Sequence, residues 1–396
     1  MSTPEILEAL VGFDTTSRRS NLPLIDWVRT YLDRQGVSYR LTHDETGEKA
    51  NLHAIIGPQV EGGLALSGHV DTVPVDGQAW STDPFRLTGK DGKLYARGAV
   101  DMKGFVASCL AAVPDLKALP LQRPVHLFIS YNEEVDCAGA RVLVRDLEAG
   151  RLRPAVCVVG EPSGMKPITA HKGRLSVRVT VRGRPGHSSV PANGVNAIHA
   201  GAEAIAWIAA EARRLQAEGR REDGFDPPHS TIHTGLVEGG SILNIIPGRA
   251  SFEMEWRTIP GDDAEVELAR LQRHAREAIE SWMHRVDPAT GFTFEPLDTL
   301  PPLSLSPEHA LVALVKQASG ANHHGKVSYG TEAGIFQNAG IASIVCGPGD
   351  IAQAHQPDEW IARDQLVACD SFIRRLGSSL TRDASLTPEA SLARDT

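Results

Sequence analysis

Short apolar runs alternate with helix-forming segments between residues 50 and 160. The apolar runs cover residues 51–57, 64–68, 125–130 and 155–160, and Gly, Pro or polar residues bound each of them. Runs of this length are typical of buried strands. Strands that alternate with helices favour a mostly parallel sheet with helices on both faces. The sequence therefore predicts an α/β fold for this part of the chain.

The pattern changes after about residue 167. Residues 175–182 alternate apolar and polar side chains, as half-exposed antiparallel strands do. Further strand and helix candidates follow at residues 231–237 and 250–256 and at residues 195–216 and 263–285. A few strands with two long helices indicate a separate α+β module inserted into a discontinuous first domain.

The α/β pattern resumes near residue 291, with helices expected at residues 309–319 and 364–376 and a strand at residues 342–346. We expect a catalytic, metal-binding domain made of residues 1–167 and 291–377, an inserted lid and dimerisation domain at residues 168–290, and a polar tail at residues 378–396. A helix that follows residue 104 is expected to stop at Pro114, since proline disrupts a helix interior.

Composition excludes several classes of function. Hydrophobic residues make up 41% of the 396, enough for a sizeable core. The net charge of −9 offers no basic field for nucleic acid or an anionic membrane, and no apolar run approaches the roughly 18 residues of a membrane span. The five cysteines are scattered and form no C-x-x-C pair, and the N-terminus lacks a secretory signal pattern. These features indicate a cytoplasmic protein without a thiolate zinc site.

Two adjacent carboxylates, Glu133 and Glu134, stand where the apolar run at residues 125–130 ends. Open α/β sheets place their sites at the carboxyl ends of parallel strands. Paired acids at such a place suggest two different roles, one as a metal ligand and one as a base. A solvated acidic loop is the alternative interpretation of this stretch taken alone.

Other acids and histidines also follow predicted strands or lie in neighbouring loops. They are His69, Asp71, Asp101, Glu161 and His355. A lone histidine or aspartate is more often structural, but several strand ends that each deliver one such residue to the same sheet edge indicate a shared site. Nitrogen and oxygen donors of this kind suit zinc, cobalt or manganese.

Five motifs in this order resemble the dinuclear zinc aminoacylase and deacetylase family. They are Gly68-His69-Val70-Asp71-Thr72-Val73-Pro74, Arg97-Gly98-Ala99-Val100-Asp101-Met102-Lys103-Gly104, Asn132-Glu133-Glu134, Gly160-Glu161-Pro162 and Ala354-His355-Gln356-Pro357-Asp358-Glu359. The resemblance extends from about residue 13 to the last predicted helix.

The resemblance implies two metal ions, zinc or in its place cobalt or manganese, bridged by Asp101. His69 and Glu161 would complete the ligands of one ion, and Glu134 and His355 those of the other. Asp71 would orient His69, and Glu133 would act as general base on a water held between the ions. The peptide between Asp101 and the next residue would be cis.

The resemblance also assigns residues of the inserted domain. His187 would reach into the site of a partner subunit in a homodimer and stabilise the oxyanion. Asn244, Arg257, Gly330 and Thr331 match substrate-side positions, with Arg257 suited to hold a carboxylate as a bidentate fork. The alternatives are a surface-loop histidine at His187 and a structural ion pair at Arg257.

Hydrolysis of the amide bond of an N-acetyl amino acid is the implied activity. Several phrases, among them Ala170-His171-Lys172-Gly173 and Tyr329-Gly330-Thr331-Glu332-Ala333, lean within the family toward a deacetylase of N2-acetyl-L-ornithine in arginine biosynthesis. An aminoacylase, a dipeptidase or carboxypeptidase, and a succinyl-diaminopimelate desuccinylase stay open. A non-catalytic binding protein with a peptidase fold is the alternative of a different class.

Overall fold

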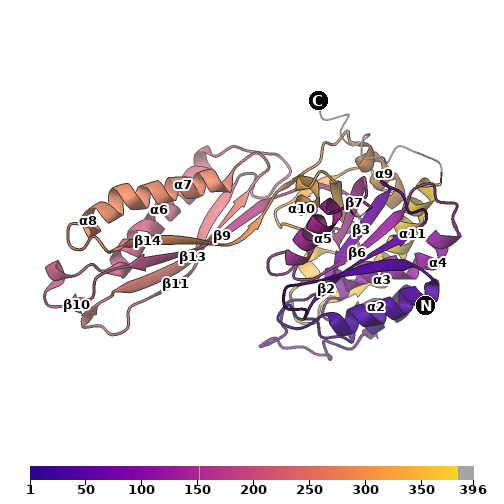
Figure 1. Cartoon of the computed structure of the whole chain (residues 1–396), viewed down its shortest axis with the longest axis horizontal. Coiled ribbons are helices and arrows are strands. Elements are labelled where there is room, and N and C mark those ends of the chain that lie inside the picture. The colour runs from indigo at the N-terminus through magenta and orange to yellow at the C-terminus, as the bar shows by residue number, and fades with distance from the viewer. Residues whose placement is uncertain (151, 382–396) are drawn as a thin grey trace. The chain divides into compact units, whose positions relative to one another are not determined.

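A computed structural model describes residues 1–150 and 152–381 (Figure 1). The chain forms two compact units. The first contains Met1–Ala170, Leu303–Lys326 and the residues from Thr331 onward, and the second contains His171–Pro302 and Val327–Gly330.

A nine-stranded sheet forms the centre of the first unit. Its main path has the order β1-β2-β6-β3-β7-β17-β8-β15, and β16 pairs with β8. The strands β6, β3, β7 and β17 run parallel, while β1, β2 and β8 add antiparallel pairings. The bounds are β1 Ser38–His43, β2 Ala50–Ile56, β3 Leu64–His69, β6 Val125–Ser130, β7 Val156–Pro162, β8 Ile168–His171, β15 Leu303–Ser304, β16 Gly325–Val327 and β17 Ala342–Gly347.

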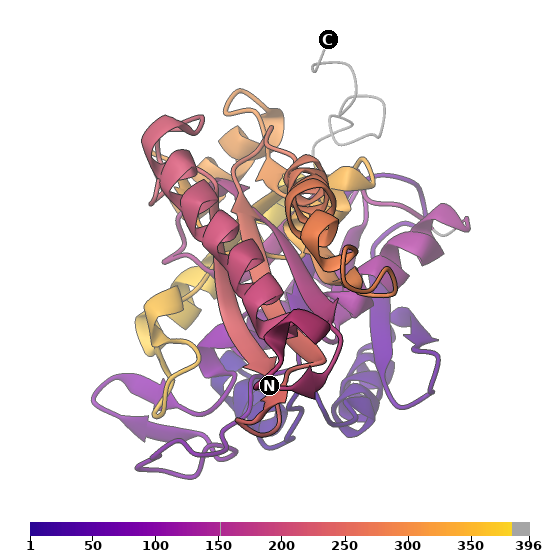
Figure 2. The same ribbon diagram turned by 90° about the vertical axis from the view of Figure 1, so that its left-hand side faces the viewer.

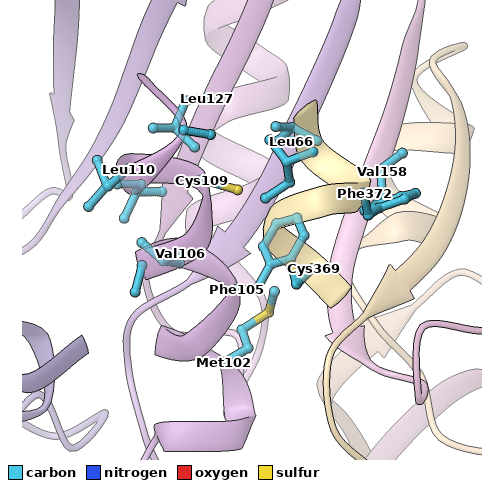
Figure 3. Close-up of a cluster of buried hydrophobic side chains, with 14 of the residues drawn as sticks. Leu66, Met102, Phe105, Val106, Cys109, Leu110, Leu127, Val158, Cys369 and Phe372 are labelled. Carbon is cyan, nitrogen blue, oxygen red and sulfur yellow. The ribbon is translucent and has the colours of Figure 1, made fainter. Parts of the chain in front are cut away.

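Helices cover both faces of this sheet. They are α1 Thr3–Val11, α2 Leu22–Gln35, α3 Gly104–Ala111, α4 Val113–Ala118, α5 Ala138–Glu148, α9 Ala310–Ser319, α10 Ala333–Asn338 and α11 Arg363–Ser379. Leu127 of β6 lies in the main core, which also contains Leu110 of α3 and Phe372 of α11 (Figure 3). The next residue, Phe128, points the other way and stacks on Phe336 of α10, with ring centroids 5.7 Å apart. The two faces of one strand thus bury side chains under different helices, and the predicted α/β fold class is confirmed.

The prediction that Pro114 ends a helix is wrong in one respect. The helix α3 stops at Ala111, but Pro114 lies in the first turn of a new helix, α4. Proline is tolerated there because the first N–H groups of a helix have no partner within the helix. A sequence pattern that marks a helix end thus marks a helix start as well.

The second unit is a four-stranded antiparallel sheet with helices on one face. Its order is β11-β13-β9-β14. The bounds are β9 Gly173–Arg182, β11 Thr231–Gly239, β13 Arg249–Thr258, β14 Gly291–Leu300, α6 Ala197–Glu218, α7 Ala264–His274 and α8 Ser281–Met283, and a two-stranded ribbon joins β10 Gly186–His187 to β12 Ile245–Ile246. Both views show α6 beside α7 over the strands (Figure 2). The sequence analysis did not anticipate β14, which pairs with β9 over nearly its whole length.

Three short strands make a small separate sheet in the first unit. They are β4 Thr88–Lys90, β5 Lys93–Tyr95 and β18 Trp360–Ala362, in the order β18-β5-β4.

The segment expected to be a polar tail begins within a helix, because α11 runs to Ser379. The rest of that segment, residues 382–396, lies outside the described residues. Among the described residues, no helix combines the length and apolar character needed to cross a membrane.

Candidate metal centre

The carboxyl ends of three neighbouring strands meet at one edge of the first unit's sheet. β3 ends at His69, β6 ends at Ser130 just before Glu133 and Glu134, and β7 contains Glu161. Because β3 pairs in parallel with both β6 and β7, these strand ends lie side by side. The acids and the histidine that follow them are therefore delivered to one place.

Asp101 lies between two histidines that come from distant parts of the chain. Its Oδ1 is 3.0 Å from His69 Nε2, and its Oδ2 is 3.2 Å from His355 Nε2. Asp101 belongs to the distorted turn η1 (Ala99–Lys103), and the peptide between Asp101 and Met102 is cis, as the resemblance implies. Each carboxylate oxygen thus faces a different histidine, which is the arrangement that a bridging ligand requires.

The remaining predicted ligands surround these three side chains. Glu134 Oε2 lies 3.0 Å from His355 Nε2, and Glu161 Oε1 lies 3.6 Å from His69 Nε2. Glu161 Oε1 is buried and accepts no hydrogen bond from any residue that the structure describes. A buried carboxylate oxygen without a donor is costly, and a bound cation would satisfy it.

Asp71 organises the turn that carries the paired acids. Its carboxylate accepts the backbone N–H of Glu133 at 3.0 Å and that of Glu134 at 3.3 Å, and also the hydroxyl of Ser17 at 2.7 Å. The His69 Nδ1 lies 3.0 Å from the backbone carbonyl of Asp71 and 3.4 Å from its carboxylate. Asp71 therefore orients the ring of His69 so that Nε2 faces the cluster, and it also places both glutamates.

Asn132 makes the turn between β6 and the glutamates possible. Its φ is 58°, in the left-handed region that asparagine tolerates better than most residues. The side-chain oxygen of Asn132 accepts a hydrogen bond from Lys49 Nζ. The turn lets the two adjacent carboxylates point into the same cluster, which an extended strand would not allow.

The cluster contains more buried carboxylates than its histidines neutralise. Burial raises the pKa of Glu133 to about 8 and that of Glu134 to about 7, and neighbouring carboxylates add to both shifts. Hydrogen bonds to Asp101 and Glu134 raise the pKa of His355 to about 10. Burial alone would raise the pKa of Asp101, but hydrogen bonds from His355 and His69 hold it well below its usual range. Such a cluster favours cations.

The donor set fits divalent metal ions of intermediate hardness. Among the residues that the structure describes, two groups of side chains have ligand atoms within 4.8 Å of one another. They are His69 with Glu133 and Glu161, and His69 with Asp101 and Glu134. Imidazole and carboxylate donors in such groups suit zinc, cobalt or manganese. The first group contains Glu133, so distance alone does not separate a base from a ligand at this position.

Two of the predicted site residues of the second unit lie together on its two-stranded ribbon. His187 belongs to β10, and Asn244 directly precedes β12. The backbone carbonyl of Asn244 accepts the backbone N–H of Ser188 at 3.1 Å. The His187 Nδ1 accepts the backbone N–H of Ser189 at 3.2 Å. When Nδ1 accepts this N–H, a neutral ring carries its proton on Nε2, and the residue is exposed.

Arg257 already has a carboxylate partner within its own strand. Its Nε lies 2.7 Å from Glu255 Oε1, and its Nη2 donates to Glu255 Oε2 at 3.2 Å. This is the ion pair that the sequence analysis considered as an alternative to substrate binding.

The predicted substrate-side residues Gly330 and Thr331 are assigned to different units. Gly330 belongs to the second unit, where an added Cβ would lie 2.4 Å from Leu300 Cδ2. Thr331 is buried in the first unit.

A buried acid that the sequence analysis did not single out lies beneath the strand ends. Glu332 is fully buried, and it accepts the hydroxyls of Ser67 in β3 at 2.5 Å and of Ser130 in β6 at 2.8 Å. Burial raises its pKa. The sequence analysis predicted roles for Gly330 and Thr331, which directly precede Glu332. No local pattern predicts a contact between Glu332 and serines more than 200 positions away. Glu332 joins the two strands that carry His69 and the paired acids.

The family model described as peptidase family M20/M25/M40 matches residues 65–378. The chain belongs to this family. Two relatives, both named acetylornithine deacetylase, are each 38% identical to the chain. The one from Myxococcus xanthus aligns over 93% of this chain and 95% of its own length, and the one from Klebsiella pneumoniae over 90% and 92%.

Solved structures of the M20 family have the same fold. A metallo-carboxypeptidase from Sulfolobus solfataricus matches with a TM-score of 0.73 and 19% identity over 96% of this chain and 99% of its own. A Bacillus subtilis protein described as a dinuclear metal-binding peptidase matches with a TM-score of 0.66 and 15% identity over 96% and 98%. As a member of this metal-dependent family, the protein is a hydrolase that acts on amide bonds.

The pKa shifts of the cluster predict how metal removal changes stability. Folding raises the pKa values of Glu133, Glu134 and His355. The folded protein therefore binds more protons than the unfolded chain between about pH 5 and pH 8, and all three groups make its stability fall as pH rises. We expect the Tm of the chelated protein to fall as pH rises through this window. The stabilisation by added Zn²⁺ should grow over the same range.

Thermal unfolding of chelated and Zn²⁺-loaded protein at several pH values measures this effect. The difference between the two curves isolates the cluster from other titrating groups. A Glu134→Gln variant should show a shallower decline in the chelated form, because one raised carboxyl is removed. A chelated protein whose Tm rises with pH would contradict the prediction.

Proposed function

We propose that this protein hydrolyses N2-acetyl-L-ornithine to L-ornithine and acetate, a step of arginine biosynthesis, with two bound metal ions. His69, Glu161 and Asp101 would hold one ion, and Glu134, His355 and Asp101 the other. When bound, the ions polarise the amide carbonyl and lower the pKa of water. The observation that carries the proposal is the convergence of these residues with Glu133 at one sheet edge, in a chain 38% identical to two acetylornithine deacetylases.

The proposed general base, Glu133, is buried beside the proposed metal ligands. Its side chain is only 11% exposed, and its Oε2 lies 4.0 Å from His69 Nε2. Burial and the neighbouring carboxylates raise the pKa of Glu133, which makes its ionised form a stronger base than an ordinary glutamate. In the proposed reaction Glu133 takes a proton from the attacking water and then delivers it to the amine that leaves. The carbonyl carbon gains the hydroxyl, and the C–N bond breaks.

A panel of substrates tests the proposed substrate against its nearest alternatives. The purified protein, loaded with Zn²⁺ or with Co²⁺, is assayed on N2-acetyl-L-ornithine, other N-acetyl amino acids, N-succinyl-diaminopimelate and dipeptides. We expect the highest kcat/KM on N2-acetyl-L-ornithine. A higher value on another class assigns that activity instead. No turnover of any substrate by protein with two bound metals would favour the non-catalytic binding protein.

We propose that the second unit joins two copies of the chain. Its edge strand β11 and the adjacent loop expose large apolar side chains: Leu236 is 62% exposed, Val237 68% and Leu243 98%. An edge strand with exposed apolar residues favours pairing with another chain. In this homodimer His187 would serve the site of the partner subunit as an oxyanion donor. A monomer in sedimentation experiments at assay concentrations would count against the proposal.

Mixing two inactive variants tests whether His187 acts across the interface. His187→Ala should retain both metals and lower kcat by about 10²–10³-fold, the usual effect of removing one oxyanion donor. Glu133→Gln is also expected to be inactive. After subunit exchange, a mixed dimer has one site with both residues intact, so about one quarter of wild-type activity should return. If His187 acts within its own subunit, the mixture stays inactive.

A further inference from the structure

A buried ion pair lies beside the metal centre without contributing a ligand to it. Arg97 Nη1 is 2.8 Å from Glu359 Oε2, and each side chain is 1% exposed. Arg97 precedes the turn that carries Asp101, and Glu359 follows the loop that carries His355. Removing two charges from water costs several kcal/mol unless further hydrogen bonds satisfy them. The partners of this pair therefore indicate what it stabilises.

The second oxygen of Glu359 binds the backbone at Asp101. Oε1 accepts the N–H of Val100 at 2.9 Å and the N–H of Asp101 at 3.2 Å. The backbone carbonyl of Glu359 accepts the N–H of Ala96 at 3.1 Å. The Glu359 carboxylate thus connects the Arg97 guanidinium to the main chain of Asp101.

Gln78 extends the same network to His355. Its Oε1 accepts hydrogen bonds from Arg97 Nη2 and from Trp80 Nε1, and its Nε2 donates to the backbone carbonyl of His355 at 3.1 Å. The φ of His355 is 62°, a left-handed conformation that a histidine keeps only when its surroundings hold it. The amide of Gln78 is a contact that supports this conformation directly.

We propose that Gln78, Arg97 and Glu359 are positioning residues that set the places of two proposed metal ligands, Asp101 and His355, relative to each other. The proposal rests on the proposed dinuclear function. Glu359 orients Asp101, which both ions share, whereas Gln78 orients His355, which serves one ion. Loss of an outer hydrogen-bond partner of a metal ligand commonly costs about 10–100-fold in metal affinity. The network therefore predicts an unequal effect on the two ions.

Two substitutions at Gln78 test its link to His355. Gln78→Glu keeps the oxygen that faces Arg97 but replaces the N–H donor to the His355 carbonyl by an oxygen. Gln78→Met is neutral and of similar length; it removes the donor and also the oxygen that accepts from Arg97 and Trp80, without adding charge. Each should weaken one of the two ions by about 10–100-fold in calorimetric titration of the chelated protein with Zn²⁺. In Gln78→Glu, which keeps the oxygen that faces Arg97, the affinity for the other ion should stay unchanged.

Glu359→Gln tests the link to Asp101. An amide in either orientation places an N–H donor against another donor, at Arg97 or at the backbone of Val100 and Asp101. Because Asp101 is shared, this variant should weaken both ions. The contrast between one weakened ion at Gln78 and two at Glu359 is not expected from a general loss of stability, which the Tm of the chelated proteins measures separately.

Gln337 supplies the matched control. Its Nε2 also donates to a backbone carbonyl, that of Ser304 at 2.6 Å, and its Oε1 accepts the N–H of the same residue. Gln337→Glu and Gln337→Met should leave both affinities unchanged. Wild-type protein that binds fewer than two ions would overturn the proposed function itself. If the wild type binds two ions, two results would overturn the positioning role. One is unchanged affinities in the Gln78 variants, and the other is equal losses of affinity in the Gln78 and Gln337 variants.

Discussion

Replacing Glu133 by glutamine is expected to lower kcat by about 10²–10⁴-fold while both metal ions stay bound. Glutamine has nearly the shape of glutamate, but it does not take a proton from water. Asp71 holds the backbone of Glu133 through a hydrogen bond at 3.0 Å, so the variant side chain keeps its place. The chemical step should therefore fail although the turn and the ligands remain.

The metal content of this variant decides between two roles. Glu133 also lies in a group with His69 and Glu161 whose ligand atoms are within 4.8 Å of one another. If Glu133 were a ligand, Glu133→Gln would lose an ion together with its activity. Metal analysis beside steady-state kinetics separates these cases, and Glu134→Gln, which removes a proposed ligand, is the matched control. Near-normal kcat with two ions bound would refute the assignment of the base.

Replacing Asp101 by asparagine is expected to release both metal ions and to abolish activity. Each oxygen of Asp101 faces a different histidine, at 3.0 Å and 3.2 Å. An amide offers one oxygen and one N–H₂ group, so it can serve as a ligand on one side only, and it also removes the negative charge shared by two cations. Both sites should therefore weaken together.

Metal analysis of Asp101→Asn after dialysis measures the outcome. Glu161→Gln and His355→Ala serve as comparisons, because each removes a proposed ligand of a single ion. Asp115→Asn provides an exposed control, since Asp115 pairs with Arg374 on the surface of the same unit. Two ions retained by Asp101→Asn would exclude a bridging role. Loss of one ion only would show that the remaining amide oxygen and the other ligands still hold the second ion.

Local patterns in the sequence were sufficient to locate most elements and the candidate residues of the metal centre. The apolar run at residues 125–130 is strand β6, and the predicted helix at residues 195–216 corresponds to α6 at Ala197–Glu218. Strand β14 was missed because Pro296 and the polar residues around it weaken the apolar alternation. Pairing with β9 makes this segment a strand all the same.

The sequence by itself determined which residues end the parallel strands, because apolar length, glycine and proline are local signals. It thereby selected His69, the paired acids Glu133 and Glu134, and Glu161 as candidates for one site. Only the tertiary structure decided how these side chains are held. Asp71 binds the backbone of residues 62 and 63 positions away, and Glu359 binds that of residues 259 and 258 positions away. Such hydrogen bonds leave no periodicity in the chain, since they exist only after folding brings distant loops together.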